Sequence, residues 1–478
     1  MKLRLLHIIY LIVFYCGNSL LFALKPVEIE GYASFAKRKE IRFFLHDDLM
    51  SKRKTLIAKT TTDDSGFFSL KIPILETREL ILSINTTEGS IFVEPEKKYQ
   101  IHISTNEELI HRVNATNLGN TLQISIQNSD SNELNYRIYY FNTYYNYFLY
   151  KHSLPILNMV KQSVYDSLIH ILSDKFPINN NPNDFYSTYV KFRIAEIERM
   201  YYRKYPEKIY TKYLNSKYVY YYNPAYMDFF IAFFQNYIHS GSKQITKNIL
   251  HQNINNTANY YELLDNLGKD PLLANEIIRE MVLIENLKDM FSYPDEFNLV
   301  NILTLLKKSA ENTKFSEHKK MAENTLEELK SLRKNTLAPN CTLKDIHNSI
   351  VTLNDYKGKY VFLHFFSTDC HECVREMLII KDLYDNYKQD IEIISIMLDF
   401  ETTRLYHFVN AHPEFKWKFL HFNSDFSFIE TYKLFSLPLG MIIDPEGYIV
   451  AYPTPPTTEI GYFFNSMFRI NKQQISPK

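Results

Sequence analysis

The sequence predicts a multidomain protein, with a β-sandwich at the N-terminus, a central all-α segment and a C-terminal α/β domain. Its length of 478 residues corresponds to about three domains. Before residue 105, short strand-like runs alternate with turn residues. After residue 335, helical spacing gives way to alternating strands and helices. Hydrophobic residues make up 45% and charged residues 23%, which is typical of a globular chain.

The overall charge argues against nucleic acid as a partner. Lysine plus arginine and aspartate plus glutamate both number 54, so the chain lacks the basic field that polyanions require. Only 11 glycines are present, and the sequence contains no glycine-rich phosphate loop, no H-E-x-x-H and no G-x-S-x-G. We therefore expect no nucleic-acid partner and no bound cofactor.

Residues 1–23 resemble a secretory signal peptide. Lys2 and Arg4 precede a twelve-residue apolar run over residues 5–16, which is shorter than the roughly 20 residues of a membrane-spanning helix. We expect cleavage near Ala23 and export to the periplasm or cell envelope. Two alternatives stay open: lipidation at Cys16, or an uncleaved N-terminus, and each would attach the protein to a membrane.

Residues 24–105 are predicted to form the β-sandwich. Short apolar or alternating runs follow one another at intervals of about ten residues, with turn residues such as Gly66 and Gly89 between them. The pattern T-x-D-x-x-G-F-F and the later stretch IFVEPEKKYQIHI resemble a small transthyretin-like sandwich. The predicted strands cover residues 41–45, 67–72, 80–84, 91–93 and 99–103.

Residues 106–335 are predicted to be helical. Leu134, Ile138, Phe141, Tyr145 and Phe148 recur at helical spacing, as do apolar residues over 194–201, 277–284 and 317–334. Several tyrosines occur in pairs and triplets, which fits packing between helices with the hydroxyls at the wet edge. A surface that binds sugars or peptides is the alternative. These clusters are Tyr144-Tyr145, Tyr201-Tyr202 and Tyr220-Tyr221-Tyr222.

Residues 336–478 are predicted to form an α/β sheet that ends in an antiparallel pair. Strands are expected over 361–366 and 391–398, with a helix over 373–387 between them. A second helix is expected over 428–434. The runs 441–443 and 448–450 then flank the turn at Asp444-Pro-Glu-Gly447 and complete a hairpin.

The chemically informative motif is Cys370-His371-Glu372-Cys373, at the junction between the 361–366 strand and the next helix. Two cysteines three residues apart on a first helical turn lie on one face, close enough for a disulfide. At a helix start, unpaired backbone N–H groups and the helix dipole favour a thiolate, which is the reactive form. Cys370 is therefore the predicted nucleophile and Cys373 the resolving cysteine.

The surroundings of this motif resemble the TlpA/ResA-like branch of the thioredoxin family. The resemblance rests on Ala338-Pro339, Val351-Thr-Leu353, Lys357-Gly358-Lys359, the C-x-x-C motif and Ser436-Leu437-Pro438-Leu439. It implies a C-terminal thioredoxin-like fold and thiol–disulfide oxidoreductase activity of the reductase or exchange type. It also implies that Pro438 is a cis-proline facing the cysteines. The partners would be protein thiol or disulfide clients and an electron-donor thiol protein.

The motif departs from this family at three places. Asp369 stands where a tryptophan usually precedes the first cysteine. The dipeptide His371-Glu372 combines a cation that would stabilise the thiolate with an anion that would oppose it. His364 stands six residues before Cys370, where thioredoxins often hold a buried acid. It is either a base for Cys373 or a core histidine.

Other interpretations of the cysteines are weaker. A zinc site needs four ligands, and the sequence has no second C-x-x-C, so we expect no metal. A peroxidatic cysteine pattern is matched in part by Ser367-x-x-Cys370, but Leu363 stands where that pattern has proline. Cys341 is expected to be a buried inert thiol or else a third redox cysteine. A redox-inactive thioredoxin-like domain in an envelope binding or scaffold protein is the alternative function.

Overall fold

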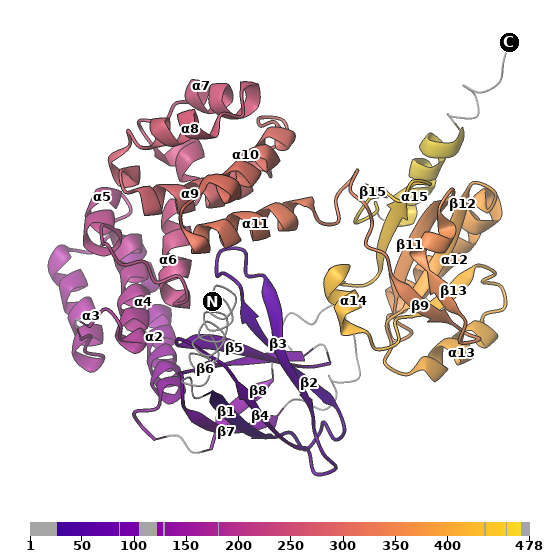
Figure 1. The fold of residues 1–478 in the computed structure, drawn as a ribbon, viewed down its shortest axis with the longest axis horizontal. Coiled ribbons are helices and arrows are strands. Elements are labelled where there is room, and N and C mark those ends of the chain that lie inside the picture. The colour runs from indigo at the N-terminus through magenta and orange to yellow at the C-terminus, as the bar shows by residue number, and fades with distance from the viewer. Residues whose placement is uncertain are drawn as a thin grey trace, which may run out of the picture. The chain divides into compact units, whose positions relative to one another are not determined.

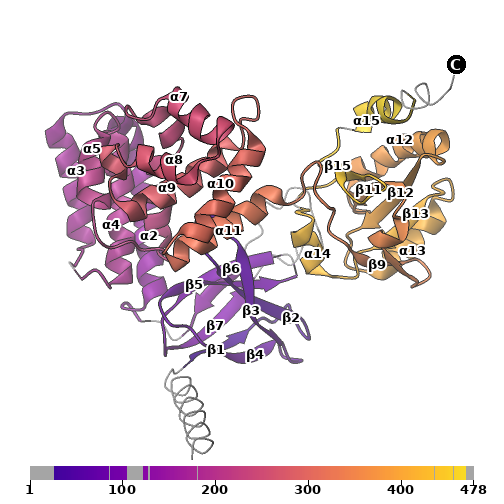
Figure 2. The same ribbon diagram turned by 45° about the horizontal axis from the view of Figure 1, so that its top comes forward.

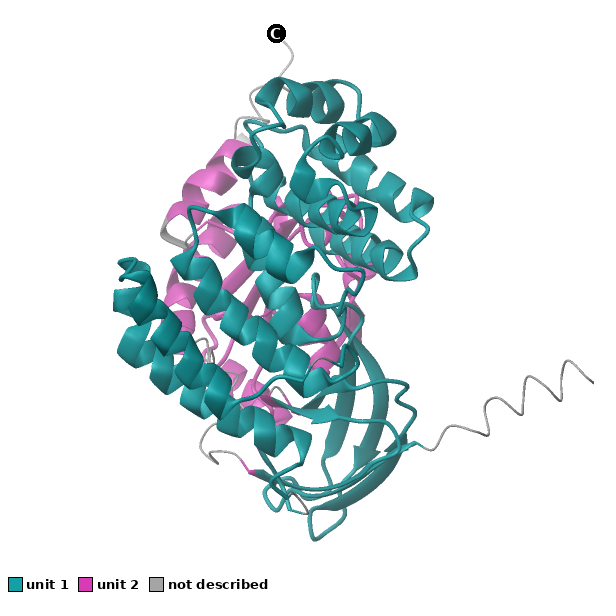
Figure 3. Cartoon of the chain, turned by 90° about the vertical axis from the view of Figure 1, so that its left-hand side faces the viewer, with its two compact units in different colours: residues 1–82, 89–103, 124–329 teal, residues 83–88, 104–123, 330–478 magenta. Residues whose placement is uncertain are grey.

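The computed structural model describes residues 26–469, except residues 86, 105–121, 128–129, 180, 435 and 456 (Figure 1). The predicted signal peptide, including Cys16, lies outside the described residues, as does the predicted boundary at residue 105. The chain forms two compact units (Figure 3): residues 1–82, 89–103 and 124–329, and residues 83–88, 104–123 and 330–478. The predicted domain boundaries stay predictions.

The N-terminal part is built from two four-stranded sheets, with strand orders β4-β1-β7-β8 and β3-β2-β5-β6. All five predicted strands are confirmed, and β1 and β3 are additional. β8 lies in the segment that was predicted to be helical, where it joins the first sheet beside β7. β1 pairs antiparallel with β4 and parallel with β7. The strands are β1 (Val27–Tyr32), β2 (Glu40–His46), β3 (Lys54–Thr61), β4 (Phe67–Ile72), β5 (Arg78–Ile84), β6 (Thr87–Val93), β7 (Lys98–Ser104) and β8 (Gln123–Ile126).

Alternation places the apolar side chains of β1 in the core. Val27 and Ile29 are buried, whereas Glu30 between the core positions faces outward and pairs with Lys98 of β7 at 2.5 Å. Gly31 lies directly over the Phe68 ring of β4, where an added Cβ would approach a ring carbon to 2.1 Å. This close approach requires glycine at that position of the sheet.

The central segment is an array of helices (Figure 2). The helical spacing at 134–148, 194–201 and 277–284 falls within α2, α4 and α9, while α11 ends at Lys330, before the end of the predicted run. Shorter π-helical and 3-10 turns lie between the helices. The α-helices are α2 (Leu134–Leu157), α3 (Gln162–Lys175), α4 (Phe185–Tyr201), α5 (Pro206–Ile209), α6 (Pro224–Phe234), α7 (Lys247–Leu250), α8 (Tyr260–Leu267), α9 (Glu276–Met290), α10 (Leu299–Asn312) and α11 (Ser316–Lys330).

Aromatic rings hold the helices together. Tyr165 of α3 stacks on Tyr201 of α4 with 3.9 Å between ring centroids, and Phe192 of α4 meets Tyr226 of α6 edge-on at 4.8 Å. Tyr145 is buried and donates to the backbone oxygen of Arg193 at 2.8 Å. These contacts support the packing interpretation of the buried tyrosines.

The C-terminal part is a seven-stranded sheet with helices against it, in the order β10-β9-β13-β12-β11-β14-β15. The predicted α/β fold is confirmed, and β11 lies between parallel β12 and antiparallel β14. The elements are β9 (Thr342–Asp345), β10 (Ile350–Thr352), β11 (Tyr360–Phe366), α12 (His371–Tyr387), β12 (Ile391–Met397), α13 (Thr402–Ala411), β13 (Lys418–His421), α14 (Phe426–Thr431), β14 (Leu439–Ile443), β15 (Ile449–Ala451) and α15 (Thr457–Phe464).

No helix among the described residues is both long and apolar enough to cross a lipid bilayer.

We predict that Asn135→Ala destabilises the N-terminal unit. The Asn135 amide accepts from the Phe92 backbone N–H at 2.6 Å and donates to the Phe92 backbone oxygen at 2.8 Å, which fastens α2 to β6. Leaving both backbone groups unpaired costs about 1–3 kcal/mol. Urea unfolding followed by far-UV circular dichroism should show a lower midpoint. The exposed Asn248→Ala on α7 is the control and should leave the midpoint in place; equal midpoints for both variants would contradict the prediction.

Candidate active site

Cys370 is the N-cap residue of α12, at the point where the chain has left β11. Its Sγ accepts a hydrogen bond from the backbone N–H of Cys373 at 3.1 Å. That N–H is one of the donors that the first turn of a helix leaves without a backbone partner. The positive end of the helix dipole and this donor both favour negative charge on the sulfur of Cys370.

The two cysteines of the motif form a disulfide, with an S–S distance of 2.15 Å and Cα atoms 5.2 Å apart. Their surroundings differ: Cys373 is fully buried against the sheet, whereas Cys370 is half-buried. A reacting molecule can therefore approach the sulfur of Cys370 but not that of Cys373.

Pro438 lies at the same edge of the sheet as the cysteines. The Leu437–Pro438 peptide bond is cis. β14 starts directly after Pro438 and runs antiparallel to β11, with Leu439 opposite Phe365. Pro438 therefore adjoins the end of β11, where the chain continues into the loop that leads to Cys370.

Asp399 and Arg404 fasten the loop that precedes Cys370. The buried Asp399 carboxylate accepts from the hydroxyls of Ser367 and Thr368, and from the Thr368 backbone N–H at 3.2 Å. Arg404 of α13 contacts Asp369 at 2.8 Å and Asp399 at 3.7 Å. Asp369 therefore stands beside Cys370 as one half of an ion pair.

The dipeptide between the cysteines faces solvent. Glu372 forms an ion pair with Arg375 one turn further along α12. The Glu372 carboxylate raises the pKa of the Arg375 guanidinium. His371 is exposed. Because Arg375 balances the charge of Glu372, Glu372 destabilises a thiolate at Cys370 less than the sequence alone indicates.

His364 is a buried histidine in the middle of the sheet. It lies on β11 and is 1% exposed, and this burial lowers its pKa to about 3. The imidazole is therefore neutral at physiological pH. A general base needs a pKa near the working pH, and His364 does not meet that condition.

Ser395 links His364 to Trp417. The indole Nε1–H of Trp417 can only donate, and it donates to Ser395 Oγ at 2.8 Å. Ser395 Oγ also lies 3.2 Å from His364 Nδ1, within hydrogen-bond distance. Among the described residues, His364 Nε2 is buried without a hydrogen-bond partner and lies 3.9 Å from the Glu376 carboxylate. The imidazole is therefore hydrogen-bonded on one side only, through Ser395.

Cys341 is a free cysteine on the segment before β9. It is half-buried, and burial raises the pKa of its thiol. A raised pKa keeps the thiol protonated, and a protonated thiol is a poor nucleophile. These properties fit the inert thiol and not a third redox cysteine.

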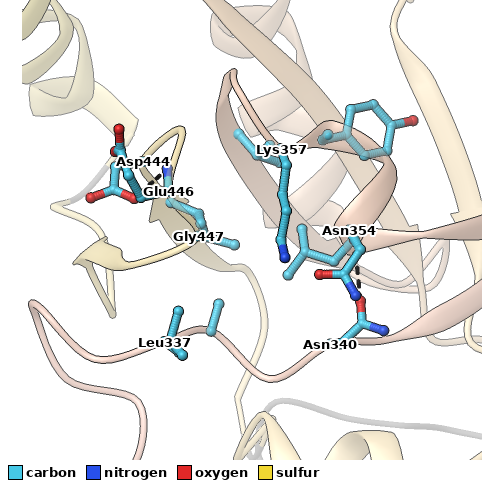
Figure 4. Close-up of a pocket in the computed structure, with 12 residues that line it drawn as sticks. Leu337, Asn340, Asn354, Lys357, Asp444, Glu446 and Gly447 are labelled. Atoms are coloured by element: carbon cyan, nitrogen blue, oxygen red, sulfur yellow. Dashed lines mark hydrogen bonds between the residues drawn. The ribbon is translucent and has the colours of Figure 1, made fainter.

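A hollow of about 230 Å³ lies at the other end of β11 (Figure 4). It is walled by the segment before β9, the loop before β11 and the turn between β14 and β15, and its charged side chains have mixed signs. The labelled residues are Leu337, Asn340, Asn354, Lys357, Asp444, Glu446 and Gly447. The hollow is separate from the cysteines, which follow the opposite end of the strand.

Among the residues that the structure describes, no group of three or more His, Cys, Asp or Glu side chains is arranged to hold a metal ion.

Sequence patterns identify some of these residues and miss others. The structure brings Cys370, Cys373 and Pro438 to one edge of the sheet and places His364 within it. Asp399 and Arg404 were missed because they follow the motif by about 30 residues and match no local pattern. The only available signal is that Asp399 directly follows a predicted buried strand, at the edge where polar side chains gather.

The comparisons with known proteins concern this C-terminal part. A model of the AhpC/TSA family matches residues 335–452. Thiol-disulfide oxidoreductase ResA of Bacillus thuringiensis is 33% identical over 115 residues, which cover 24% of this chain and 65% of that protein. ResA of Halalkalibacterium halodurans is 32% identical over 127 residues, covering 26% of this chain and 69% of that protein.

Among solved structures, the thioredoxin domain of a thiol-disulfide oxidoreductase from Bacteroides vulgatus is similar at 26% identity, with a TM-score of 0.26. The similarity covers 28% of this chain and 99% of that one. The chain spans about two-thirds of the length of the ResA relatives, and all four predicted site residues lie within the 335–452 match.

We predict that Asp399→Asn loosens the loop before Cys370. The amide loses the negative charge that faces Arg404 and one acceptor for the hydroxyls of Ser367 and Thr368, which costs about 2–3 kcal/mol. Trp417 is the single tryptophan of the chain, so its fluorescence during urea unfolding reports on this unit. Asp385→Asn, which removes an exposed pair with Lys381, should change stability by less than about 0.5 kcal/mol. The prediction is wrong if the two variants unfold alike.

We predict that His364 makes the C-terminal unit less stable in acid. The pKa of His364 is near 6.5 in the unfolded chain and about 3 in the folded protein. Below pH 6.5 the unfolded chain therefore binds more protons than the folded one, so the free energy of unfolding decreases as the pH is lowered. The loss between pH 7 and pH 5 should be roughly 1–2 kcal/mol. His364→Asn keeps an acceptor for Ser395 and cannot take up charge, so its urea midpoint should fall less over this interval. An equal fall in both proteins would refute the assignment.

Proposed function

Because the chain belongs to the TlpA/ResA-like thioredoxin family, we propose that it is a thiol–disulfide oxidoreductase that acts on protein disulfides through Cys370 and Cys373. The observation that carries this proposal is the position of Cys370. Its sulfur is the accessible member of the pair and caps α12, where a backbone donor and the helix dipole favour the thiolate.

The exchange proceeds in two substitutions at sulfur. In the reduced protein, the Cys370 thiolate attacks one sulfur of a client disulfide; a Cys370–client bond forms and the second client sulfur leaves as a thiolate. The Cys373 thiolate then attacks Cys370 Sγ and releases the remaining client sulfur. Two electrons have passed to the client, and Cys370 is again bonded to Cys373. A donor dithiol protein reduces this disulfide by the same steps in reverse.

The burial of Cys373 supports this division of roles. A fully buried thiol cannot meet a client disulfide, but it lies within bonding distance of Cys370 as the structure stands. The same adjacency favours disulfide exchange over the peroxidatic alternative for Cys370, because the C-x-x-C partner is three residues away and Leu363 stands where that pattern has proline.

We assign His364 and Pro438 to different parts of the site. Pro438, together with the backbone at Leu437, would border the bound client next to the cysteines. His364 would act as a neutral core residue that packs with Ser395 and Trp417 inside the sheet, because burial lowers its pKa to about 3 and Ser395 Oγ lies 3.2 Å from its Nδ1.

Export is the second part of the proposal. Lys2, Arg4 and the apolar run at 5–16 support a signal peptide, and an oxidising compartment would supply disulfide-bonded clients. The partners would be such client proteins and an electron-donor thiol protein in the periplasm or cell envelope. An uncleaved or lipidated N-terminus would hold the enzyme at a membrane.

We predict that Cys370→Ser abolishes disulfide reduction. The hydroxyl of serine is not ionised at neutral pH and cannot replace the thiolate, so turnover of insulin with dithiothreitol as donor should fall to the uncatalysed rate. Cys341→Ser should retain wild-type turnover, because this thiol lies outside the pair. If wild type and Cys370→Ser are equally inert, the C-terminal part is redox-inactive and the protein is a binding or scaffold protein.

The companion variant Cys373→Ser should accumulate mixed disulfides with clients in the host envelope, because the second substitution cannot occur. Non-reducing gels followed by mass spectrometry identify the trapped proteins. A Cys373→Ser, Cys370→Ser double variant is the matched control and should trap none. Equal recovery from the single and double variants would contradict the assignment of Cys370 as nucleophile.

A further inference from the structure

Helix α2 has two apolar faces on opposite sides. One face packs into the helical core through Leu134, Ile138, Phe141, Tyr145 and Phe148. The other lies toward solvent and forms a continuous stripe, which we call the α2 stripe. It consists of Tyr136, Tyr139, Thr143, Tyr147, Tyr150, Leu154 and Leu157. At 100° per residue, these positions fall within about 100° of the helix circumference.

The α2 stripe differs from scattered surface hydrophobic residues because its exposed members are contiguous. The exposed fraction of its tyrosines and leucines ranges from 41% at Leu157 to 88% at Tyr150, and the stripe contains no charged residue. At about 200 Å² per tyrosine, the exposed side chains together offer roughly 600–800 Å² of surface. A contiguous patch of this size marks an interaction surface.

The α2 stripe is long and narrow, a shape that one face of another helix matches. Successive members are separated by three, four, four, three, four and three residues, which keeps them on one side of α2. From residue 136 to residue 157 the stripe is about 30 Å long. The partner helix needs a matching uncharged stripe of about the same length.

Six of the seven α2 stripe positions exchange places when the helix direction is reversed. Positions 136, 139 and 143 lie as far before the midpoint between residues 146 and 147 as positions 157, 154 and 150 lie after it. Two copies of α2 in antiparallel arrangement therefore bring Tyr136 opposite Leu157, Tyr139 opposite Leu154, and Thr143 opposite Tyr150. The smallest member then faces the most exposed one, so Tyr150 fills the space beside Thr143.

We infer that the α2 stripe is a two-fold dimer interface, and that its partner is α2 of a second copy of this chain. A two-fold axis requires each surface to match itself, which six of the seven stripe positions do, while Tyr147 lies beside the axis and faces position 146 of the second copy. Two copies together bury up to roughly 1,200–1,600 Å², the size of a standard stable interface. Tyrosine also suits this role, because each ring adds apolar area while its hydroxyl stays at the wet rim.

A hollow beside the N-terminal end of the α2 stripe adds to the fit. It has a volume of about 470 Å³ and lies between β6, β8 and α2, with Phe92, Ile124, Tyr136 and Tyr139 in its wall. In the antiparallel arrangement the partner's Leu154 and Leu157 approach this end of the stripe. The hollow therefore provides space for the C-terminal end of the second α2.

The dimer can be tested by sedimentation equilibrium of residues 24–478, which is the form expected after signal cleavage. We expect the wild type to be a dimer at tens of micromolar. Tyr150→Lys and Thr143→Glu each bury a charge without an opposite charge, and each should raise the dissociation constant by roughly 30-fold or more. Tyr462→Lys, at a position 80% exposed outside α2, is the matched control and should remain dimeric.

The double variant Thr143→Glu, Tyr150→Lys decides whether the pairing is antiparallel. The carboxylate introduced at position 143 would then face the ammonium introduced at position 150 of the second copy, twice across the axis. The double variant should therefore recover much of the affinity that either single variant lost. Circular dichroism of all variants should match the wild type. A monomeric wild type overturns the proposal, including a monomer that instead binds vesicles or peptides through α2. A double variant whose dissociation constant is as high as that of the single variants, or higher, also overturns it.

Discussion

The buried Asp399 carboxylate is the constraint on which the active-site geometry depends. It gathers the hydroxyls of Ser367 and Thr368 and the charge of Arg404, and so fixes the turn between β11 and α12. Only with this turn in place does Cys370 become the cap of α12 and accept the N–H of Cys373. The nucleophile is therefore prepared by an anion that does not touch its sulfur.

The local motifs of the C-terminal part are predictable because each lies in a short stretch of chain. The C-x-x-C motif, the apolar run of β11 and the proline before β14 could be recognised together, and they meet at one edge of the sheet. Asp399 could not be assigned in this way, because its partners lie about 30 residues away and an aspartate after a strand is common. The role of His364 depends on Ser395 and Trp417, which only the folded sheet brings next to it.

In the first unit, the spacing of apolar residues in the sequence predicted fewer of the structural features. β3 has no fully buried residue, so its sequence carries no alternating apolar signal. The core face of α2 was recognised from Leu134 to Phe148, but the same helix carries a second series of apolar residues half a turn away. Because apolar residues lie on both sides of α2, the sequence does not show one apolar and one polar side. Only the exposed fractions in the folded protein separate the core face from the α2 stripe.

The hydroxyl of Ser395 has a consequence for how this part of the protein can diverge. It accepts from Trp417 and lies within hydrogen-bond distance of His364 Nδ1, so it joins two buried polar side chains that would otherwise lack this partner. An acid at position 364 would accept from the Ser395 hydroxyl while that hydroxyl still accepts from Trp417, so serine and tryptophan do not by themselves require histidine. Divergence at this buried site should therefore preserve a polar link between positions 364, 395 and 417 more strictly than the identity of residue 364.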